Sequence, residues 1–108
     1  MKSITTERLQ TLQSENRDFL LVNTLDAEYF QKTKIPGSVN IPLLQDDFTT
    51  KVLEASGSKQ KMVVTYCASD ECNSSAQAAE KLEDAGFNVT DYEGGAKAWK
   101  DAGQPLAV

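Results

Sequence analysis

The two cysteines of this chain lie close together, in the polar segment from residue 67 to residue 74. A cysteine thiolate is a strong nucleophile that can form covalent intermediates, and a lowered thiol pKa makes it available at neutral pH. The chain contains no histidine, which excludes histidine-dependent catalytic triads, histidine-ligated metals and the most common general base. Any nucleophilic chemistry at Cys67 or Cys72 must therefore be activated by other groups.

Cys67 directly follows residues 62–66, where β-branched and aromatic residues after a polar run give the clearest strand pattern of the chain. A helix is predicted to begin shortly after Cys67. A short loop between Cys67 and this helix turns backbone N–H groups inward, and the helix N-terminus adds partial positive charge. Both effects favour the thiolate over the thiol. A buried, unreactive cysteine is the alternative, but the polar loop favours a reactive Cys67. The residues predicted to bind a substrate through loop amides and the helix N-terminus are Ala68, Ser69, Asp70, Glu71, Asn73 and Ser74.

Apolar and amphipathic segments alternate along the chain. Strands are predicted at residues 20–22, 39–42, 62–66 and 87–92. Helices are predicted after Thr5 or Thr6, after Asp26, and over residues 43–55, 74–85 and 96–102. Ser74 is predicted to cap the helix over residues 74–85, with Gly86 ending it. Alternating strands and helices predict an α/β fold with a parallel sheet, in which sites form at the carboxyl ends of the strands.

Length and charge set further limits. The 108 residues suffice for one core, so we expect a single domain over residues 1–108. No apolar run approaches the roughly 20 residues of a membrane helix, and no hydrophobic signal segment is present, so we expect a cytoplasmic protein without membrane contact. The net charge is −5: residues 62–108 hold eight acidic and three basic side chains, and residues 1–61 hold eight of each. Without a Lys/Arg cluster, nucleic acid is not expected as a partner. We interpret the acidic half as a solvated surface rather than a docking face.

Four segments, in order, resemble the signatures of the rhodanese-like domain family. Residues 21–24, 28–29 and 35–42 are similar to the family's N-terminal signature, and residues 63–67 (VVTYC) to the strand that delivers its active cysteine. Residues 74–87 are similar to the helix after the active loop, and Gly94, Gly95 and Trp99 to the C-terminal signature. The resemblance implies a three-layer α/β/α fold with a central, mostly parallel sheet of about five strands.

The resemblance also implies a function. Cys67 would take sulfane sulfur from a donor, hold it as a persulfide and pass it to a thiol or another nucleophilic acceptor. The donor would be thiosulfate, a persulfide or a polysulfide, and the acceptor a small thiol or a sulfur-relay protein. Such a sulfurtransferase needs no metal or organic cofactor, and we expect a monomer. The covalent intermediate predicts ping-pong kinetics.

The chain departs from the family pattern in two places. Asn23, Leu25 and Lys34 stand where many members have Asp, Arg and His, which we interpret as drift of the scaffold with loss of an ion pair. The active loop is longer than the usual sulfurtransferase loop and contains no arginine that could hold an oxyanion. Asp70 and Glu71 would repel a small dianion unless solvent screens them. Phosphatase and arsenate reductase activities are therefore disfavoured, and a persulfide or polysulfide is favoured over thiosulfate.

Cys72 leaves two alternatives open. It lies five positions after Cys67 and could form a disulfide with it. Attack of Cys72 on a Cys67 persulfide would release sulfide and leave that disulfide, giving a thiol-dependent reductase or a redox switch. Cys72 could equally be an incidental thiol.

For the protein as a whole, the rival to a sulfurtransferase is a catalytically weak rhodanese-fold module that regulates or binds a partner. Trp99 is predicted as a core residue rather than a substrate platform, and Tyr66 and Tyr92 are predicted as strand residues.

Overall fold

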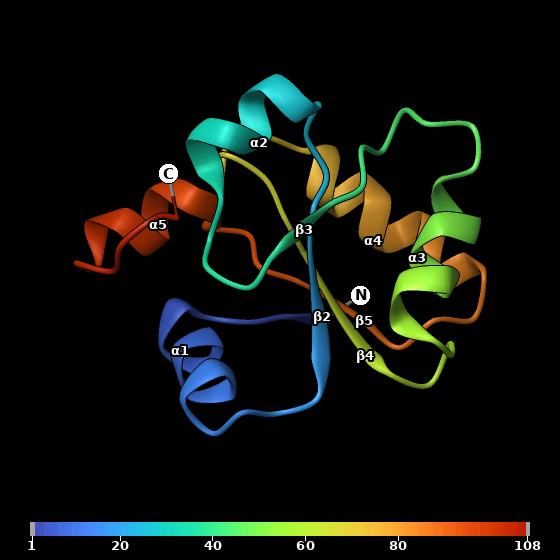
Figure 1. Ribbon diagram of the computed structural model, residues 1–108, viewed down its shortest axis with the longest axis horizontal. Coiled ribbons are helices and arrows are strands. Elements are labelled where there is room, and N and C mark those ends of the chain that lie inside the picture. The colour runs from blue at the N-terminus through green and yellow to red at the C-terminus, as the bar shows by residue number, and fades with distance from the viewer. Residues whose placement is uncertain (1, 108) are drawn as a thin grey trace.

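A computed structural model describes residues 2–107 of the chain. Five parallel strands form one sheet in the order β1-β5-β4-β2-β3 (Figure 1). The strands are β1 (Lys2–Ser3), β2 (Phe19–Asn23), β3 (Val39–Asn40), β4 (Met62–Tyr66) and β5 (Val89–Asp91). The helices are α1 (Thr6–Ser14), α2 (Ala27–Thr33), α3 (Phe48–Ser56), α4 (Ser74–Asp84) and α5 (Gly95–Asp101). The predicted α/β fold with a parallel sheet is confirmed.

Alternation along the central strands separates two hydrophobic cores. Leu21 of β2 pairs with Val64 of β4, and both belong to the cluster that includes α1 and α5 residues. Val22 and Val63 belong to the other cluster, with residues of α3 and α4. Because successive side chains of a strand point to opposite faces, β2 and β4 are apolar on both sides and occupy the middle of the sheet.

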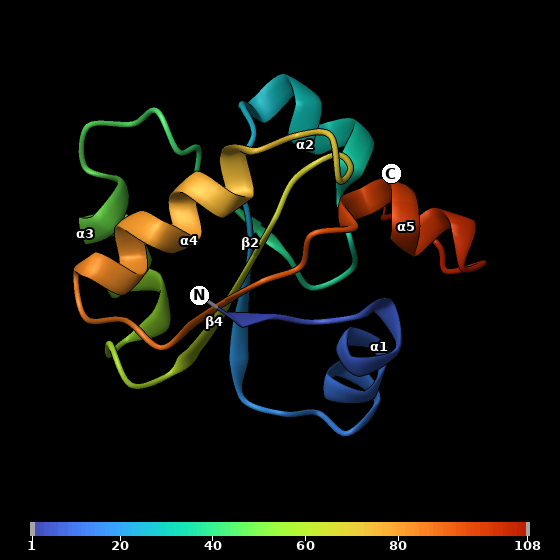
Figure 2. The ribbon, with the colours of Figure 1, turned by 180° about the vertical axis from the view of Figure 1, so that it is seen from behind.

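Helices cover both faces of the sheet. Figures 1 and 2 show α1 and α5 on one side of the sheet and α3 and α4 on the other, with α2 beyond the carboxyl ends of β2 and β4. Trp99 is buried in the core beside α1 and α5, as predicted, and Tyr66 and Tyr92 are buried in the same core. Tyr66 ends β4, as predicted, whereas Tyr92 follows the end of β5. Among residues 2–107, no helix is long and apolar enough to cross a membrane.

Two local predictions were wrong, and one strand was not predicted. The helix expected over residues 43–55 begins only at Phe48, because the chain after Pro42 first makes turns in which the Gln45 amide bonds the Pro42 carbonyl. Ser74 is the first residue of α4 rather than its cap, and Asn73 occupies the cap position without a side-chain cap bond. The edge strand β1 had no predicted counterpart. Thr5 does cap α1, accepting a hydrogen bond from the Arg8 amide at 3.1 Å.

Candidate active site

Cys67 lies at the carboxyl edge of the sheet, where the direction of the strand order reverses. The chain leaves β2 toward β3 on one side, whereas it leaves β4 toward β5 on the other. In parallel sheets, a crevice that binds ligands forms at such a switch point. The Thr24 amide, just after β2, donates to the Tyr66 carbonyl at 3.1 Å, which fixes the two strand ends side by side. Cys67 therefore begins its loop at the place where this fold builds sites.

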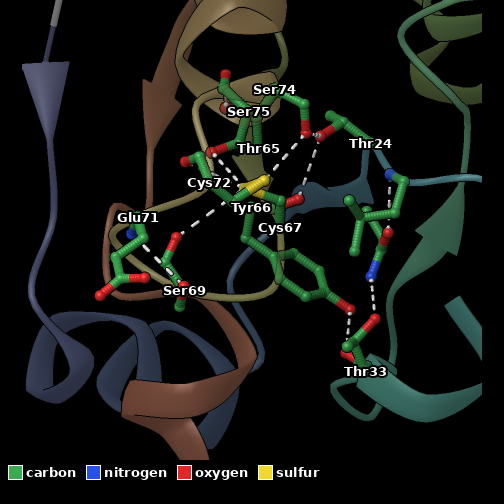
Figure 3. Close-up of a disulfide and its surroundings, with 12 residues drawn as sticks. Thr24, Thr33, Thr65, Tyr66, Cys67, Ser69, Glu71, Cys72, Ser74 and Ser75 are labelled. Carbon is green, nitrogen blue, oxygen red and sulfur yellow. Dashed lines mark hydrogen bonds between the residues drawn. A yellow bond between two sulfur atoms is a disulfide. The ribbon is translucent and has the colours of Figure 1, made fainter. Parts of the chain in front are cut away.

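The structure joins Cys67 and Cys72 in a disulfide, with their Cα atoms 6.4 Å apart (Figure 3). Cys67 is 1% exposed, whereas Cys72 is partly exposed. The Ser75 hydroxyl lies 3.5 Å from Cys67 Sγ, and Ser75 is the second residue of α4. Cys67 is thus beside the first turn of an eleven-residue helix, as the sequence predicted. The partial positive charge at the N-terminus of this helix favours a negatively charged sulfur.

Two carbonyl oxygens also face Cys67 Sγ, from Cys72 at 3.3 Å and from Ser69 at 4.0 Å. The amides of Glu71 and Cys72 bond Ser69 instead, at its hydroxyl (3.3 Å) and its carbonyl (3.1 Å). The disulfide form therefore has acceptors, rather than a ring of amides, around this sulfur. Binding of a persulfide by the loop amides stays a prediction for the reduced loop.

Cys72 is connected through Ser74 to a cleft that lies between the segment after β2 and the start of α4. Its Sγ lies 3.4 Å from the Ser74 hydroxyl, which lies 2.9 Å from the Thr24 hydroxyl. Ser74 and Thr24 also line a cleft of about 220 Å³. Its apolar walls include Leu44, 83% exposed, and Tyr29, 52% exposed. Neither cysteine is among the residues that line this cleft, and Ser74 is the residue that connects it to Cys72. The sequence indicated neither the cleft nor the role of Thr24.

The start of α5 holds the first residues of the loop. The amides of Ala96 and Lys97 donate to the carbonyls of Cys67 at 2.9 Å and Ala68 at 2.8 Å. Gly95 lies so close that a Cβ there would be 2.5 Å from the Cys67 carbonyl oxygen. Its φ of +65° also favours glycine. The sequence indicated Gly94 and Gly95 as part of the C-terminal signature, but it did not indicate the contact of Gly95 with the loop.

The two loop carboxylates are exposed. Asp70 and Glu71 lie on the surface, and Figure 3 shows the Glu71 side chain pointing away from the disulfide. The hydrogen bond from Lys97 to Asp101 raises the pKa of the exposed Lys97, and the charges of Asp70 and Glu71 add to this rise. Solvent and Lys97 therefore screen the loop, which weakens the expected repulsion of anionic donors.

Asp91 is a buried carboxyl group that the sequence analysis did not single out. It ends β5 and is 1% exposed. Burial raises the pKa of Asp91, hydrogen bonds from the Ser75 and Thr65 hydroxyls oppose this rise, and the Glu93 charge adds to it. The available signal was an acidic residue within the apolar strand pattern of residues 87–92.

Asn23 anchors the segment after β2 where many family members have an aspartate. It is fully buried. Its side-chain amide donates to the Thr33 hydroxyl at 3.0 Å, and its oxygen accepts from the Leu25 amide at 3.0 Å. Lys34 lies over the Phe30 ring, 5.6 Å from its centre. A neutral hydrogen-bond network therefore supports this end of β2.

Comparison with known proteins identifies the family of this chain. A family model described as the rhodanese-like domain matches residues 5–102. The chain belongs to the rhodanese-like domain family. A rhodanese-like domain protein from Staphylococcus aureus has a similar structure, with 30% identity, a TM-score of 0.78 and full coverage of both chains. A thiosulfate sulfurtransferase from Pseudomonas aeruginosa shares the fold, with 23% identity and a TM-score of 0.84 over 97% of this chain and 20% of that one.

A curated relative matches this chain over part of its own length. The HTH-type transcriptional regulator Rv0324 of Mycobacterium tuberculosis is 29% identical over 92 residues, which are 85% of this chain. The match spans only 39% of the length of that regulator. The family model and the similar solved structures confirm the predicted family and fold class.

Proposed function

We propose that this rhodanese-like domain is a sulfurtransferase whose Cys67 carries sulfane sulfur as a persulfide and whose Cys72 resolves it. The observation that carries the proposal is the placement of both thiols in one loop, with Cys67 beside the first turn of α4 and Cys72 within disulfide distance. The family, which includes sulfurtransferases, supports it, as does the fold shared with a thiosulfate sulfurtransferase.

The chemistry follows thiol exchange. The Cys67 thiolate attacks the sulfane sulfur of the donor and displaces sulfite from thiosulfate, or a shorter sulfide chain from a polysulfide. An acceptor thiolate then takes the outer sulfur and leaves the Cys67 thiolate. When no acceptor arrives, the Cys72 thiolate attacks Cys67 Sγ, hydrosulfide leaves, and the disulfide seen in the structure forms.

The acceptor route is proposed to use the cleft beside Ser74 and Thr24. Its apolar walls suit a small thiol or an apolar side chain of a sulfur-relay protein. Because Asp70 and Glu71 are exposed, both thiosulfate and polysulfide are worth testing as donors, with polysulfide expected to react faster. The loop contains no arginine, so cleavage of phosphate or arsenate is not part of the proposal.

Persulfide loading tests the proposal. Reduced wild type, Cys72→Ser and Cys67→Ser are incubated with thiosulfate or polysulfide, and the loop peptide is examined by mass spectrometry while released sulfide is measured. Cys72→Ser should accumulate one added sulfur on Cys67, wild type should release sulfide and form the disulfide, and Cys67→Ser should do neither. If Cys72→Ser gains no sulfur from either donor although its Cys67 thiol is alkylated readily, the sulfurtransferase proposal is wrong.

A redox-controlled binding module is the second candidate. Two observations favour it: the Cys67–Cys72 disulfide, and the relative in which a matching segment belongs to a transcriptional regulator. In this case the disulfide forms with an oxidant without any persulfide. The loading experiment separates the two candidates, because the module would form its disulfide with peroxide but gain no sulfur from either donor.

A further inference from the structure

Two hydroxyl groups form a hydrogen-bonded chain that ends on the sulfur of Cys72 (Figure 3). The Ser74 hydroxyl lies 3.4 Å from Cys72 Sγ, and the Thr24 hydroxyl lies 2.9 Å from the Ser74 hydroxyl. Thr24 follows β2 and is 3% exposed, whereas Ser74 is the first residue of α4. The Ser74 hydroxyl does not cap the helix, because Asn73 occupies the cap position. The pair therefore connects the end of β2 to Cys72, and the sulfur transfer described above gives it no role.

The disulfide determines the direction of these hydrogen bonds. A disulfide sulfur has no proton, so Ser74 is the donor to Cys72 Sγ. Because a hydroxyl has only one proton to donate, Thr24 must be the donor to Ser74. The Tyr66 carbonyl oxygen is the other acceptor near the Thr24 hydroxyl, but it lies 3.4 Å away, beyond the usual range for a hydroxyl donor. Each proton is thus used once, and the chain delivers a hydrogen bond to the sulfur.

The two sulfurs differ in what surrounds them. The carbonyl oxygens of Cys72 and Ser69 lie 3.3 Å and 4.0 Å from Cys67 Sγ, and the Ser75 hydroxyl lies 3.5 Å from it. Carbonyl oxygens disfavour a thiolate and so oppose what a hydroxyl donor provides. At Cys72 Sγ the hydrogen bond comes from a donor that is itself hydrogen-bonded, which favours a thiolate. This loop conformation therefore suits negative charge on Cys72 better than on Cys67.

We propose that the Ser74 hydroxyl activates Cys72 as the resolving nucleophile and that Thr24 positions Ser74. The inference rests on the proposed function, in which Cys72 attacks a Cys67 persulfide. Because that attack ends in the disulfide, the structure shows where Cys72 Sγ lies as the new bond forms. Ser74 contacts this reacting sulfur and is a catalytic residue, whereas Thr24 acts through Ser74 and is a positioning residue.

The resolving step balances without any further reactant. The Cys72 thiol first loses its proton to solvent, and the Ser74 hydroxyl donates to the thiolate. The thiolate forms a bond to Cys67 Sγ, the bond from Cys67 Sγ to the outer sulfur breaks, and hydrosulfide leaves with the electron pair and the persulfide proton. The two cysteines are oxidised to the disulfide, and the sulfane sulfur is reduced to sulfide.

The first experiment measures Cys72 alone, in the Cys67→Ser background. The rate at which Cys72 attacks a dipyridyl disulfide is recorded across a range of pH. Loss of the Ser74 hydroxyl should make Cys72 a weaker acid by about ten-fold, the low end for a hydrogen bond to a charged group. A weaker acid has less thiolate, but its thiolate is more nucleophilic. Ser74→Ala should therefore be about three-fold slower than its parent at low pH and about three-fold faster at high pH, a reversal that a purely structural change would not produce.

Thr24→Val and Thr24→Ser form the matched pair, because Thr24→Val keeps the shape of the side chain and Thr24→Ser keeps its hydroxyl. Thr24→Val should change the profile in the same direction as Ser74→Ala but by a smaller factor. Thr24→Ser and Ser74→Thr should both keep the profile of the parent. The charged side chains on this side of the molecule are the same in every variant: Asp26, Asp70, Glu71 and Lys97.

The second experiment follows resolution in the protein with both cysteines. After loading with polysulfide, Ser74→Ala should release sulfide about three-fold more slowly than wild type at low pH. If Ser74→Ala keeps the profile of its parent in the first experiment, the inference is overturned. Persulfide loading of Cys72→Ser tests the proposed function separately, because that variant has no resolving thiol. If loading fails while the Ser74→Ala profile reverses as expected, sulfur transfer is wrong and the activation of Cys72 stands.

Discussion

Replacing Gly95 by alanine should loosen the active loop and destabilise the fold. A Cβ at this position would lie 2.5 Å from the Cys67 carbonyl oxygen and 2.9 Å from the Ser69 amide nitrogen. Both are backbone atoms, which cannot rotate away as a side chain can. The loop and the start of α5 must therefore separate. The two hydrogen bonds that the backbone amides of Ala96 and Lys97 donate to the loop are then weakened or lost.

Three contributions determine how much Gly95→Ala lowers the free energy of unfolding. An L side chain at φ +65° costs roughly 1–2 kcal/mol. The overpacking adds about 1–3 kcal/mol, which includes movement of the backbone, and weakening of two hydrogen bonds adds up to about 1 kcal/mol each. These contributions sum to about 2–7 kcal/mol. We expect a loss near the middle of that range, about 3–5 kcal/mol in the free energy of unfolding, which is a large part of the stability of a chain of this length.

Gly103→Ala is the control that separates the clash from the backbone angle. Gly103 has a φ of +82°, and a Cβ at this position would have no neighbouring atom within 4 Å. Gly103→Ala therefore has only the conformational cost of about 1–2 kcal/mol. Urea unfolding followed by circular dichroism should place the midpoint of Gly95→Ala about 1–2 M below that of Gly103→Ala. Equal midpoints for the two variants would refute the claim that Gly95 is fixed by the loop it contacts.

Two further predictions concern buried polar groups. The Tyr66 hydroxyl accepts from the Ile35 amide and donates to the Thr33 carbonyl, both at 3.0 Å, so Tyr66→Phe should lower the free energy of unfolding by about 2 kcal/mol. The exposed control Tyr29→Phe should change it by less than about 0.5 kcal/mol, and similar urea midpoints would contradict this. Because burial raises the pKa of Asp91 above 3.8, the folded state binds more protons than the unfolded state between 3.8 and the raised pKa, and stability should fall as pH rises through that window. Asp91→Asn should remove this fall in urea titrations at several pH values, and a wild-type curve no steeper than that of the variant would argue against it.

The order of the elements and the place of Cys67 could be predicted because local patterns determine them. The β-branched run of β4 can be buried on both faces only in the middle of a sheet, and a loop that follows such a strand reaches the carboxyl edge. Gly86, with a φ of +90°, follows the end of α4, as its position after an amphipathic run indicated. The resemblance to the rhodanese-like family rested on the same segments.

Other features depend on contacts between distant segments and left no local pattern. The strand β1 is two exposed residues that pair with β5 through their backbones, so no side-chain alternation marks them. The hydrogen bonds from the start of α5 to the loop are donated by backbone amides. No particular residue type is needed for them, so the sequence does not indicate them. Asp91 lies beside Thr65 and Ser75 only because β4, β5 and α4 pack together.

The disulfide and the active thiol place opposite demands on one loop. In the disulfide form, the Cys72 carbonyl lies 3.3 Å from Cys67 Sγ, which suits a neutral sulfur but not the thiolate or persulfide anion that sulfur transfer requires. At its start the loop is fixed, since α5 holds the carbonyls of Cys67 and Ala68. At its end α4 begins at Ser74. We therefore expect any reorientation on reduction to be confined to residues 69–73, where it would turn the carbonyls away from the sulfur while β4 and α4 keep Cys67 in place.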